Sequence, residues 1–261
     1  MRKFVAYRTR ILKISIVIPT LNEVHALGAT LDAVNELRAP AHEIIVVDGG
    51  SKDGTIELAR ERSSDSPNGF LRLINSECGR GAQMHAGACA ASGDVFLFLH
   101  ADTIPPVDAT ERIAEALKDA RAIGGNYAIS FDGMKASARF MTGLYPRLRR
   151  LGLCYGDSAF FVRREAYEQV GGFQSLPIFE DLDLLRRLRR TGRFVHLTSM
   201  VTTSARRFER KSFALTFARW STLQALYWAG VHPRALVRFY APVRAARSKQ
   251  PGAVKDSGKD S

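Results

Sequence analysis

Apolar runs alternate with amphipathic segments along the first 120 residues. The runs are short and rich in β-branched or aromatic residues, which predicts buried strands, and the segments between them have apolar residues at helical spacing. The predicted strands are Ile14–Pro19, Ile44–Val47, Leu71–Ile74 and Val95–Leu99, and the predicted helices are Glu23–Leu37 (capped by Asn22), Ile56–Arg62, Gly79–Ser92 and Pro105–Ala120. This alternation is typical of an α/β fold with a mostly parallel sheet and helices on both faces.

The pattern becomes mixed after Ala120. Strands are predicted over Gly124–Phe131, Ala159–Val162 and Phe194–Leu197, helices over Arg164–Val170 and Asp181–Arg190, and a long apolar helix, broken by Arg219, over residues 212–230. We therefore divide the chain into a basic N-terminal segment (1–13), one α/β domain (14–200), a basic and apolar helical C-terminal extension (201–247) and a disordered tail (248–261).

Composition bounds the class of protein. The 261 residues, 46% of them hydrophobic, suffice for one sizeable core. The three cysteines have no metal-ligand spacing, which favours reduced thiols in a cytoplasmic protein. The basic N-terminus lacks the apolar region of a signal peptide, and no stretch reaches the roughly 18 uncharged apolar residues of a membrane span.

The positive charge is concentrated near the C-terminus. From Arg186 onward there are 17 Lys and Arg against 3 Asp and Glu, a net charge of +14, which leaves −2 on residues 1–185. A basic region of this kind can bind nucleic acid, an anionic membrane surface or an anionic small substrate, or can simply be a solvated face.

Carboxylates stand at the ends of predicted strands. Asp48 follows one buried strand, Asp102 follows another, and Glu180 and Asp181 open a helix. Ligands of parallel sheets bind beyond the carboxyl ends of the strands, so Asp48 and Asp102 are expected to face one crevice, although each carboxylate could instead cap a helix. The first strand–helix turn has neither the GxGxxG fingerprint nor a P-loop lysine, which argues against hydride transfer and P-loop chemistry.

Five segments in order carry a resemblance: SIVIPTLNE, IIVVDGGSKDGT, GRGAQMHAGACAASGDVFLFLHADT, GDSAFFVRREAYEQVGGF and FEDLDLLRRLRRTGR. Together they resemble an inverting family 2 glycosyltransferase with the Rossmann-like GT-A fold. The ending VTTSARRFER is similar to that of bacterial members associated with arsenosugar biosynthesis.

The resemblance implies a nucleotide-sugar pocket. The residues it places there are Pro19, Thr20, Glu23, Asp48, Ala101 and Asp102, with a UDP-sugar as the first guess for the donor. Asp102 matches the last Asp of the family's metal-binding motif and would hold Mn²⁺ or Mg²⁺ against the donor phosphates. His100 replaces that motif's first Asp. It could ligate the metal, contact the donor or pack beneath the pocket.

The resemblance also implies the reacting groups. Asp181 matches the family's general base, and Glu180 would orient the acceptor or act on Asp181 as a like charge. Gly156 and Asp157 lie on the acceptor side, where Asp157 could equally stabilise a turn. Three arginines would neutralise the leaving diphosphate, or form a basic surface: Arg80, Arg206 and Arg207.

Several partners and roles stay open. The acceptor is a small molecule or a lipid-linked hydroxyl, and no nucleic acid is expected. The apolar helix from Phe213 to Val231 packs as a lid, forms a dimer contact or rests on a membrane, which would make the protein peripheral on the inner face of the cell membrane. The alternative function is a nucleic-acid or membrane-surface binding protein that uses the basic C-terminal region on a degenerate transferase fold.

Overall fold

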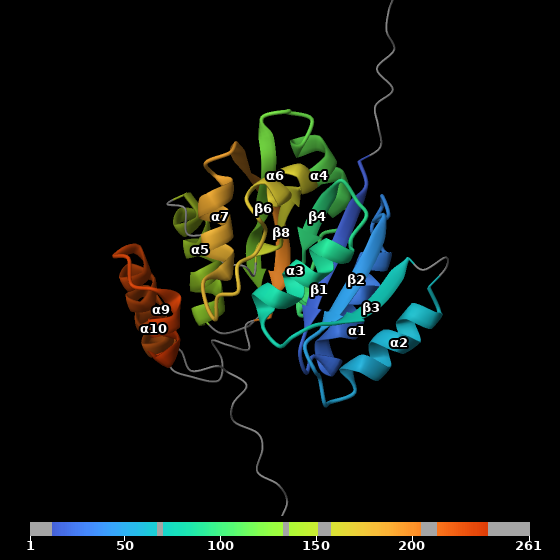
Figure 1. The fold of residues 1–261 in the computed structure, drawn as a ribbon, viewed down its shortest axis with the longest axis horizontal. Helices are drawn as coiled ribbons and strands as arrows, with labels where there is room; N and C mark the ends of the chain where they lie inside the picture. Colours follow the sequence, from blue (N-terminus) through green and yellow to red (C-terminus); the bar gives the residue numbers. More distant parts are fainter. Residues whose placement is uncertain (1–11, 67–69, 133–135, 151–157, 205–212, 240–261) are drawn as a thin grey trace, which may run out of the picture.

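The computed structural model describes residues 12–66, 70–132, 136–150, 158–204 and 213–239. These residues form one eight-stranded sheet with helices against it (Figure 1), in the strand order β3-β2-β1-β4-β7-β6-β8-β5. The strands are β1 Ile14–Thr20, β2 Glu43–Asp48, β3 Leu71–Asn75, β4 Val95–Phe98, β5 Thr103–Ile104, β6 Ala122–Phe131, β7 Phe160–Arg163 and β8 Arg193–Thr203. The helices are α1 Val24–Asn35, α2 Thr55–Ser64, α3 Arg80–Ala90, α4 Ala109–Ala116, α5 Ala136–Arg150, α6 Arg164–Gln169, α7 Glu180–Leu188, α9 Phe213–Trp228 and α10 Pro233–Leu236, followed by the 3₁₀ turn η3 Val237–Phe239.

The sheet is mostly parallel, as predicted. β3, β2, β1 and β4 pair in parallel, β7 runs antiparallel to both β4 and β6, and β6 pairs in parallel with β8. Because β7 is antiparallel to the strand on each side of it, β6 and β8 point the same way as β1 and β4. Among the strands of the described residues, the carboxyl ends of six therefore meet at one edge of the sheet, and β7 and β5 run the other way.

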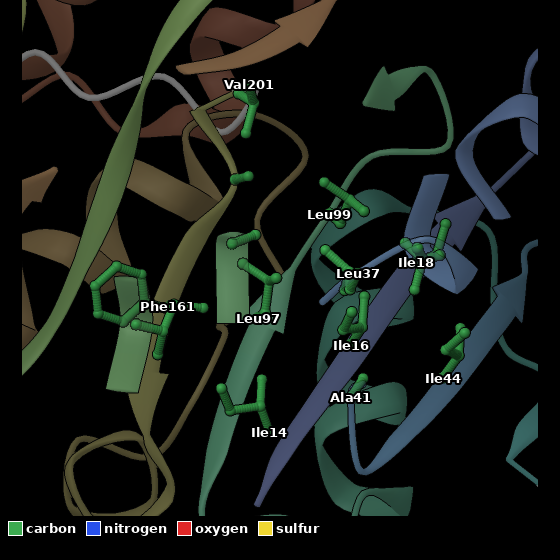
Figure 2. Packing of buried hydrophobic residues seen from close by; sticks show 14 of the residues in the cluster. Ile14, Ile16, Ile18, Leu37, Ala41, Ile44, Leu97, Leu99, Phe161 and Val201 are labelled. Carbon is green, nitrogen blue, oxygen red and sulfur yellow. The ribbon is translucent and has the colours of Figure 1, made fainter. Parts of the chain in front are cut away.

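Both faces of the sheet are covered, which explains why the central strands are continuous apolar runs. On β1, Ile16 and Ile18 pack into one core cluster while Val17, between them, packs into the other. Figure 2 shows the first cluster, where Ile16 and Ile18 lie near Leu37 and Ile44. A rigid two-sided core fixes the strand ends, and the strand ends carry the polar side chains.

The predicted cap of the first helix was wrong. Asn22 adopts a left-handed backbone (φ 55°), and its Oδ1 accepts a hydrogen bond from the Lys52 backbone at 2.8 Å. The start of α1 is instead capped by the next loop along the sheet: Asp53 Oδ2 accepts from the Val24 backbone at 3.3 Å and Thr55 Oγ1 from the Glu23 backbone at 2.8 Å.

Other differences concern element ends. The helix predicted from Pro105 begins only at Ala109, with Asp108 at its N-cap position; Pro106 disfavours a helical backbone at Pro105, the residue before it. β8 extends to Thr203, six residues past its predicted end, and α5 and β5 were not predicted. Arg219 does not interrupt α9, since its side chain is exposed and leaves the helical backbone continuous.

Candidate functional site

The carboxyl ends of β1, β2 and β4 bring three of the predicted residues to one edge of the sheet. Thr20 ends β1, Asp48 ends β2 in register with it, and Asp102 lies in the turn after β4. Because β1 lies between β2 and β4, the ends of these two strands are two strand spacings apart, about 10 Å. Asp48 and Asp102 thus lie at a common edge of the sheet, and that they face one crevice stays a prediction.

Asp48 is held firmly by the glycine-rich turn that follows it. Asp48 is 1% exposed, and its carboxylate accepts hydrogen bonds from the Gly50 backbone at 2.7 Å and the Ser51 backbone at 2.9 Å, as well as from the Ser51 hydroxyl. Gly50 has a φ of 94°, which an L-residue rarely adopts, so the turn needs glycine there. The result is a fixed carboxylate at the end of a strand.

Helix α3 joins this turn to the rest of the site, through a residue that the sequence analysis did not select. The buried Gln83 donates from Nε2 to the backbone oxygens of Thr20 at 2.6 Å and Val47 at 2.8 Å. Helix α3 can pack this close to the sheet because residue 87 is glycine: a Cβ at that position would overlap the Val17 side chain. A buried amide donor pointing at two strand ends is not a pattern that one sequence reveals.

The start of α3 also meets the start of α7. Arg80 Nε donates to Glu180 Oε1, and its guanidinium lies 3.6 Å from Asp181 Oδ2. The Glu180 and Asp181 side chains are 4% and 6% exposed, whereas that of Arg80 is 32% exposed. Two adjacent buried carboxylates thus share one partly exposed cation, which compensates a charge that would otherwise be costly to bury.

The backbone around this pair is specialised. Phe179, directly before Glu180, has a left-handed φ of 63°, and a Cβ at Gly81 would lie 3.1 Å from the Glu180 side chain. A larger residue at position 81 would therefore crowd the contact between α3 and α7. Positive φ at a residue other than glycine is uncommon and is concentrated at functional sites.

The turn after β4 carries the candidate metal residues. The Thr103 backbone bonds the His100 carbonyl at 3.1 Å, Ala101 is buried with its carbonyl accepting from Thr30 Oγ1 at 2.8 Å, and His100 and Asp102 are half-buried. Across the described segments, no three His, Cys, Asp or Glu side chains gather as a metal-ligand cluster. One carboxylate fits a hard divalent cation only if water and donor phosphates complete its shell, as such cations favour.

The remaining predicted residues divide into two groups. Pro19 is half-buried next to Thr20, and Glu23 is buried at the start of α1, so both lie near the end of β1. Gly156, Asp157, Arg206 and Arg207 lie outside the described residues. Their predicted roles are untested.

Comparisons with known proteins identify the class. The solved structure of mannosyltransferase PcManGT from Pyrobaculum calidifontis, in complex with GDP-Man and Mn²⁺, has a TM-score of 0.62 and is 20% identical, covering 84% of this chain and 63% of that one. The fold is thus the GT-A fold of glycosyltransferases. The family description "Glycosyl transferase family 2" matches residues 15–171, and the chain belongs to that family.

Curated relatives are similar over less than half of the chain. A dolichol-phosphate mannosyltransferase from Pyrococcus furiosus is 37% identical over 119 residues, which cover 44% of this chain and 34% of the relative. An undecaprenyl-phosphate 4-deoxy-4-formamido-L-arabinose transferase from Yersinia pestis is 34% identical over 117 residues, 43% of this chain and 36% of the relative. The chain matches only about a third of the length of these relatives.

Proposed function

We propose that this protein is an inverting glycosyltransferase that moves a sugar from a nucleoside diphosphate donor to an acceptor hydroxyl. The observation that carries the proposal is that one turn of α3 contacts both halves of the site. Arg80 pairs with the two carboxylates of α7, and Gln83, three residues on and on the same face, binds the ends of β1 and β2 beside Asp48. These contacts support the proposal, because they join the ends of β1 and β2 to the start of α7, where the donor half and the base are proposed to lie.

In the proposed reaction, Asp181 takes the proton of the acceptor hydroxyl while the hydroxyl oxygen attacks the anomeric carbon. The bond from that carbon to the diphosphate oxygen breaks, and the nucleoside diphosphate leaves with the electron pair. A positioned base of this kind contributes typically about 10²–10⁴-fold. Attack from the face opposite the leaving group inverts the anomeric configuration.

The other residues are proposed to bind and orient the donor. Asp48, with Pro19, Thr20 and Glu23, would contact the base or ribose, and Asp102 would hold Mn²⁺ or Mg²⁺. When bound, the cation neutralises negative charge on the leaving diphosphate. We keep direct metal ligation by His100 as the less favoured of its roles, because imidazole suits Mg²⁺ poorly.

Arg80 is proposed to serve both halves. Its guanidinium compensates Glu180 and Asp181, and its partly exposed side can also reach anionic donor oxygens. Its position in the first turn of α3, where backbone N–H groups face outward, supports that second role. Arg206 and Arg207 are proposed to add further positive charge to the diphosphate.

The finer identity is also a proposal. UDP is our first choice of nucleotide, and GDP is the alternative, because the structurally similar mannosyltransferase was solved with GDP-Man. The names of the curated relatives favour a lipid-linked acceptor over a small molecule. Membership of the arsenosugar-associated subgroup and a cytoplasmic location stay predictions from the sequence.

Thermal shift with nucleotides tests donor binding. UDP or GDP with Mn²⁺ should raise the melting temperature, because a ligand that binds only the folded state stabilises it. Asp48→Asn should weaken this shift, whereas Asp183→Asn, on α7 and paired with Arg187 at 2.7 Å, should not. If no nucleoside diphosphate raises the melting temperature at millimolar concentration, the proposal is wrong. If the basic region instead binds nucleic acid, retention on DNA would fall steeply with salt and would not require Asp48.

A further inference from the structure

The C-terminal helical unit, residues 213–239, presents apolar side chains to solvent. Leu215 is 72% exposed, Trp228 61% and Phe239 64%, with Leu226 and Val231 also exposed. Leu215 and Leu226 are eleven residues apart, about three helical turns, and lie along one edge of the exposed side of α9. Trp228, two residues after Leu226 and so about 200° further round the helix, lies along the other edge of that side. Large exposed apolar side chains gathered on one element indicate an interaction surface.

The opposite side of α9 is already occupied. Leu223 is buried in a small cluster with Ile178 and Leu236, and the Tyr227 ring lies 5.1 Å from the Phe179 ring. Burial raises the pKa of Tyr227, and the charges of Asp183 and Asp181 act in the same direction. The exposed side chains are therefore not needed to attach α9 to the domain.

The positive charge of this unit favours an anionic partner. Residues 213–239 contain three arginines, Arg219, Arg234 and Arg238, all exposed, and no Asp or Glu. A second copy of the chain would bring the same arginines together without acidic residues of the unit to offset them. An anionic bilayer instead offers headgroup charge for the arginines and an apolar layer for Trp228 and its neighbours.

We infer that the outer face of the α9–α10 unit docks on an anionic membrane surface and lies in the plane of the interface. Tryptophan suits that depth because its ring is apolar and its N–H can reach water. None of the helices in the described part of the chain has the length and apolar character needed to cross a bilayer. Helix α9 has 16 residues and is buried against the domain on the side of Leu223, so we place it along the membrane surface, with its exposed side toward the lipid.

The position of this surface connects it to the site. The inner face of α9 packs on Ile178 and Phe179, and Phe179 directly precedes the carboxylates of α7. A docked α9 would place the start of α7 toward the lipid headgroups. This placement favours an acceptor hydroxyl carried by a membrane lipid, a step that rests on the proposed function.

Vesicle sedimentation of the full chain tests the surface. The probes are phosphatidylcholine vesicles with and without about 30% phosphatidylglycerol, at about 0.15 M salt. We expect sedimentation with the anionic vesicles and little with the neutral ones. Leu226→Gln with Trp228→Gln should weaken partitioning roughly tenfold or more, because two large apolar side chains no longer leave water.

The matched control is Val107→Gln. Val107 is 46% exposed and precedes α4, which lies across the molecule from α9 in Figure 1. It should leave partitioning and melting temperature unchanged. No binding of the wild type, equal binding of wild type and the double variant, or self-association that the double variant abolishes would each overturn the inference. The last outcome would show that a second copy covers the face.

Fluorescence gives a second readout that does not depend on the double variant folding. Both tryptophans of the chain, Trp220 and Trp228, lie in α9, so the emission reports on this helix alone. Brominated lipid in anionic vesicles should quench the wild type, and Trp228→Phe should remove most of that quenching. Unquenched wild-type emission with bound vesicles would contradict docking through this face. Neither assay uses a sugar donor, so failure here leaves the transferase proposal standing.

Discussion

Replacing Arg80 should expose how strongly the start of α3 is coupled to the carboxylates of α7. Arg80→Ala leaves Glu180 and Asp181, 4% and 6% exposed, without the cation that they share. Breaking a buried pair costs about 3–5 kcal/mol, and the 32% exposure of Arg80 lets water compensate part of it, so we expect a loss of roughly 2–4 kcal/mol in unfolding free energy. Glu180→Gln removes one of the two charges and relieves part of that penalty.

Urea unfolding of a double-mutant cycle measures this coupling. Wild type, Arg80→Ala, Glu180→Gln and the double variant should give an interaction free energy of about 1.5–3 kcal/mol, with the double variant less destabilised than the sum of the singles. The control cycle uses Arg112 and Asp108, a pair at the start of α4 at 2.8 Å whose side chains are 56% and 19% exposed, which should couple by at most about 0.5 kcal/mol. Additive losses at Arg80 and Glu180 would refute the reasoning.

Three further outcomes follow from other parts of the molecule. Asp102→Asn should abolish the extra thermal shift that Mn²⁺ gives to a nucleoside diphosphate, and His100→Ala should reduce it less; the reverse order would exchange their roles. Gly87→Ala should lower the unfolding free energy by about 1–3 kcal/mol, because its methyl group would overlap Val17; an unchanged midpoint in urea would contradict the close approach. Burial alone would raise the pKa of Glu43, but hydrogen bonds outweigh it and lower the pKa to about 2. The ionised Glu43 side chain should therefore contribute up to about 3 kcal/mol to the unfolding free energy above its ordinary pKa, and this contribution should disappear as pH falls from about 5 to about 2. Urea unfolding of wild type and Glu43→Gln between pH 7 and pH 2 should give different unfolding free energies near pH 7 and equal ones near pH 2.

The strands could be predicted because burial on both faces requires unbroken apolar runs. The four consecutive branched apolar side chains of Ile44–Val47 are typical of a strand that is buried on both faces, and Asp48 after them is the last residue of that strand. The pairing of elements far apart in the chain could not be predicted in this way. The ion pair between Arg80 and Glu180 joins residues 100 positions apart, and the direction of β7 depends on its neighbours in the sheet.

Local rules failed where another segment supplied the partner. Asn22 has a side chain that often caps helices, but the backbone N–H groups at the start of α1 donate instead to Asp53 and Thr55, which follow β2. Gln83 resembles any polar helix residue until the fold places it against two strand ends. Both misses concern side chains whose role is set by tertiary neighbours rather than by the residues beside them.

The central claim is that Asp181 acts as the base of a sugar transfer from a nucleoside diphosphate donor. The most direct measurement is release of nucleoside diphosphate from a panel of UDP- and GDP-sugars with Mn²⁺, for wild type, Asp181→Asn and Asp183→Asn. We predict that at least one sugar is turned over, that Asp181→Asn slows release about 10²-fold or more while still binding the nucleotide, and that Asp183→Asn is close to wild type. Equal release by wild type and Asp181→Asn would contradict the account.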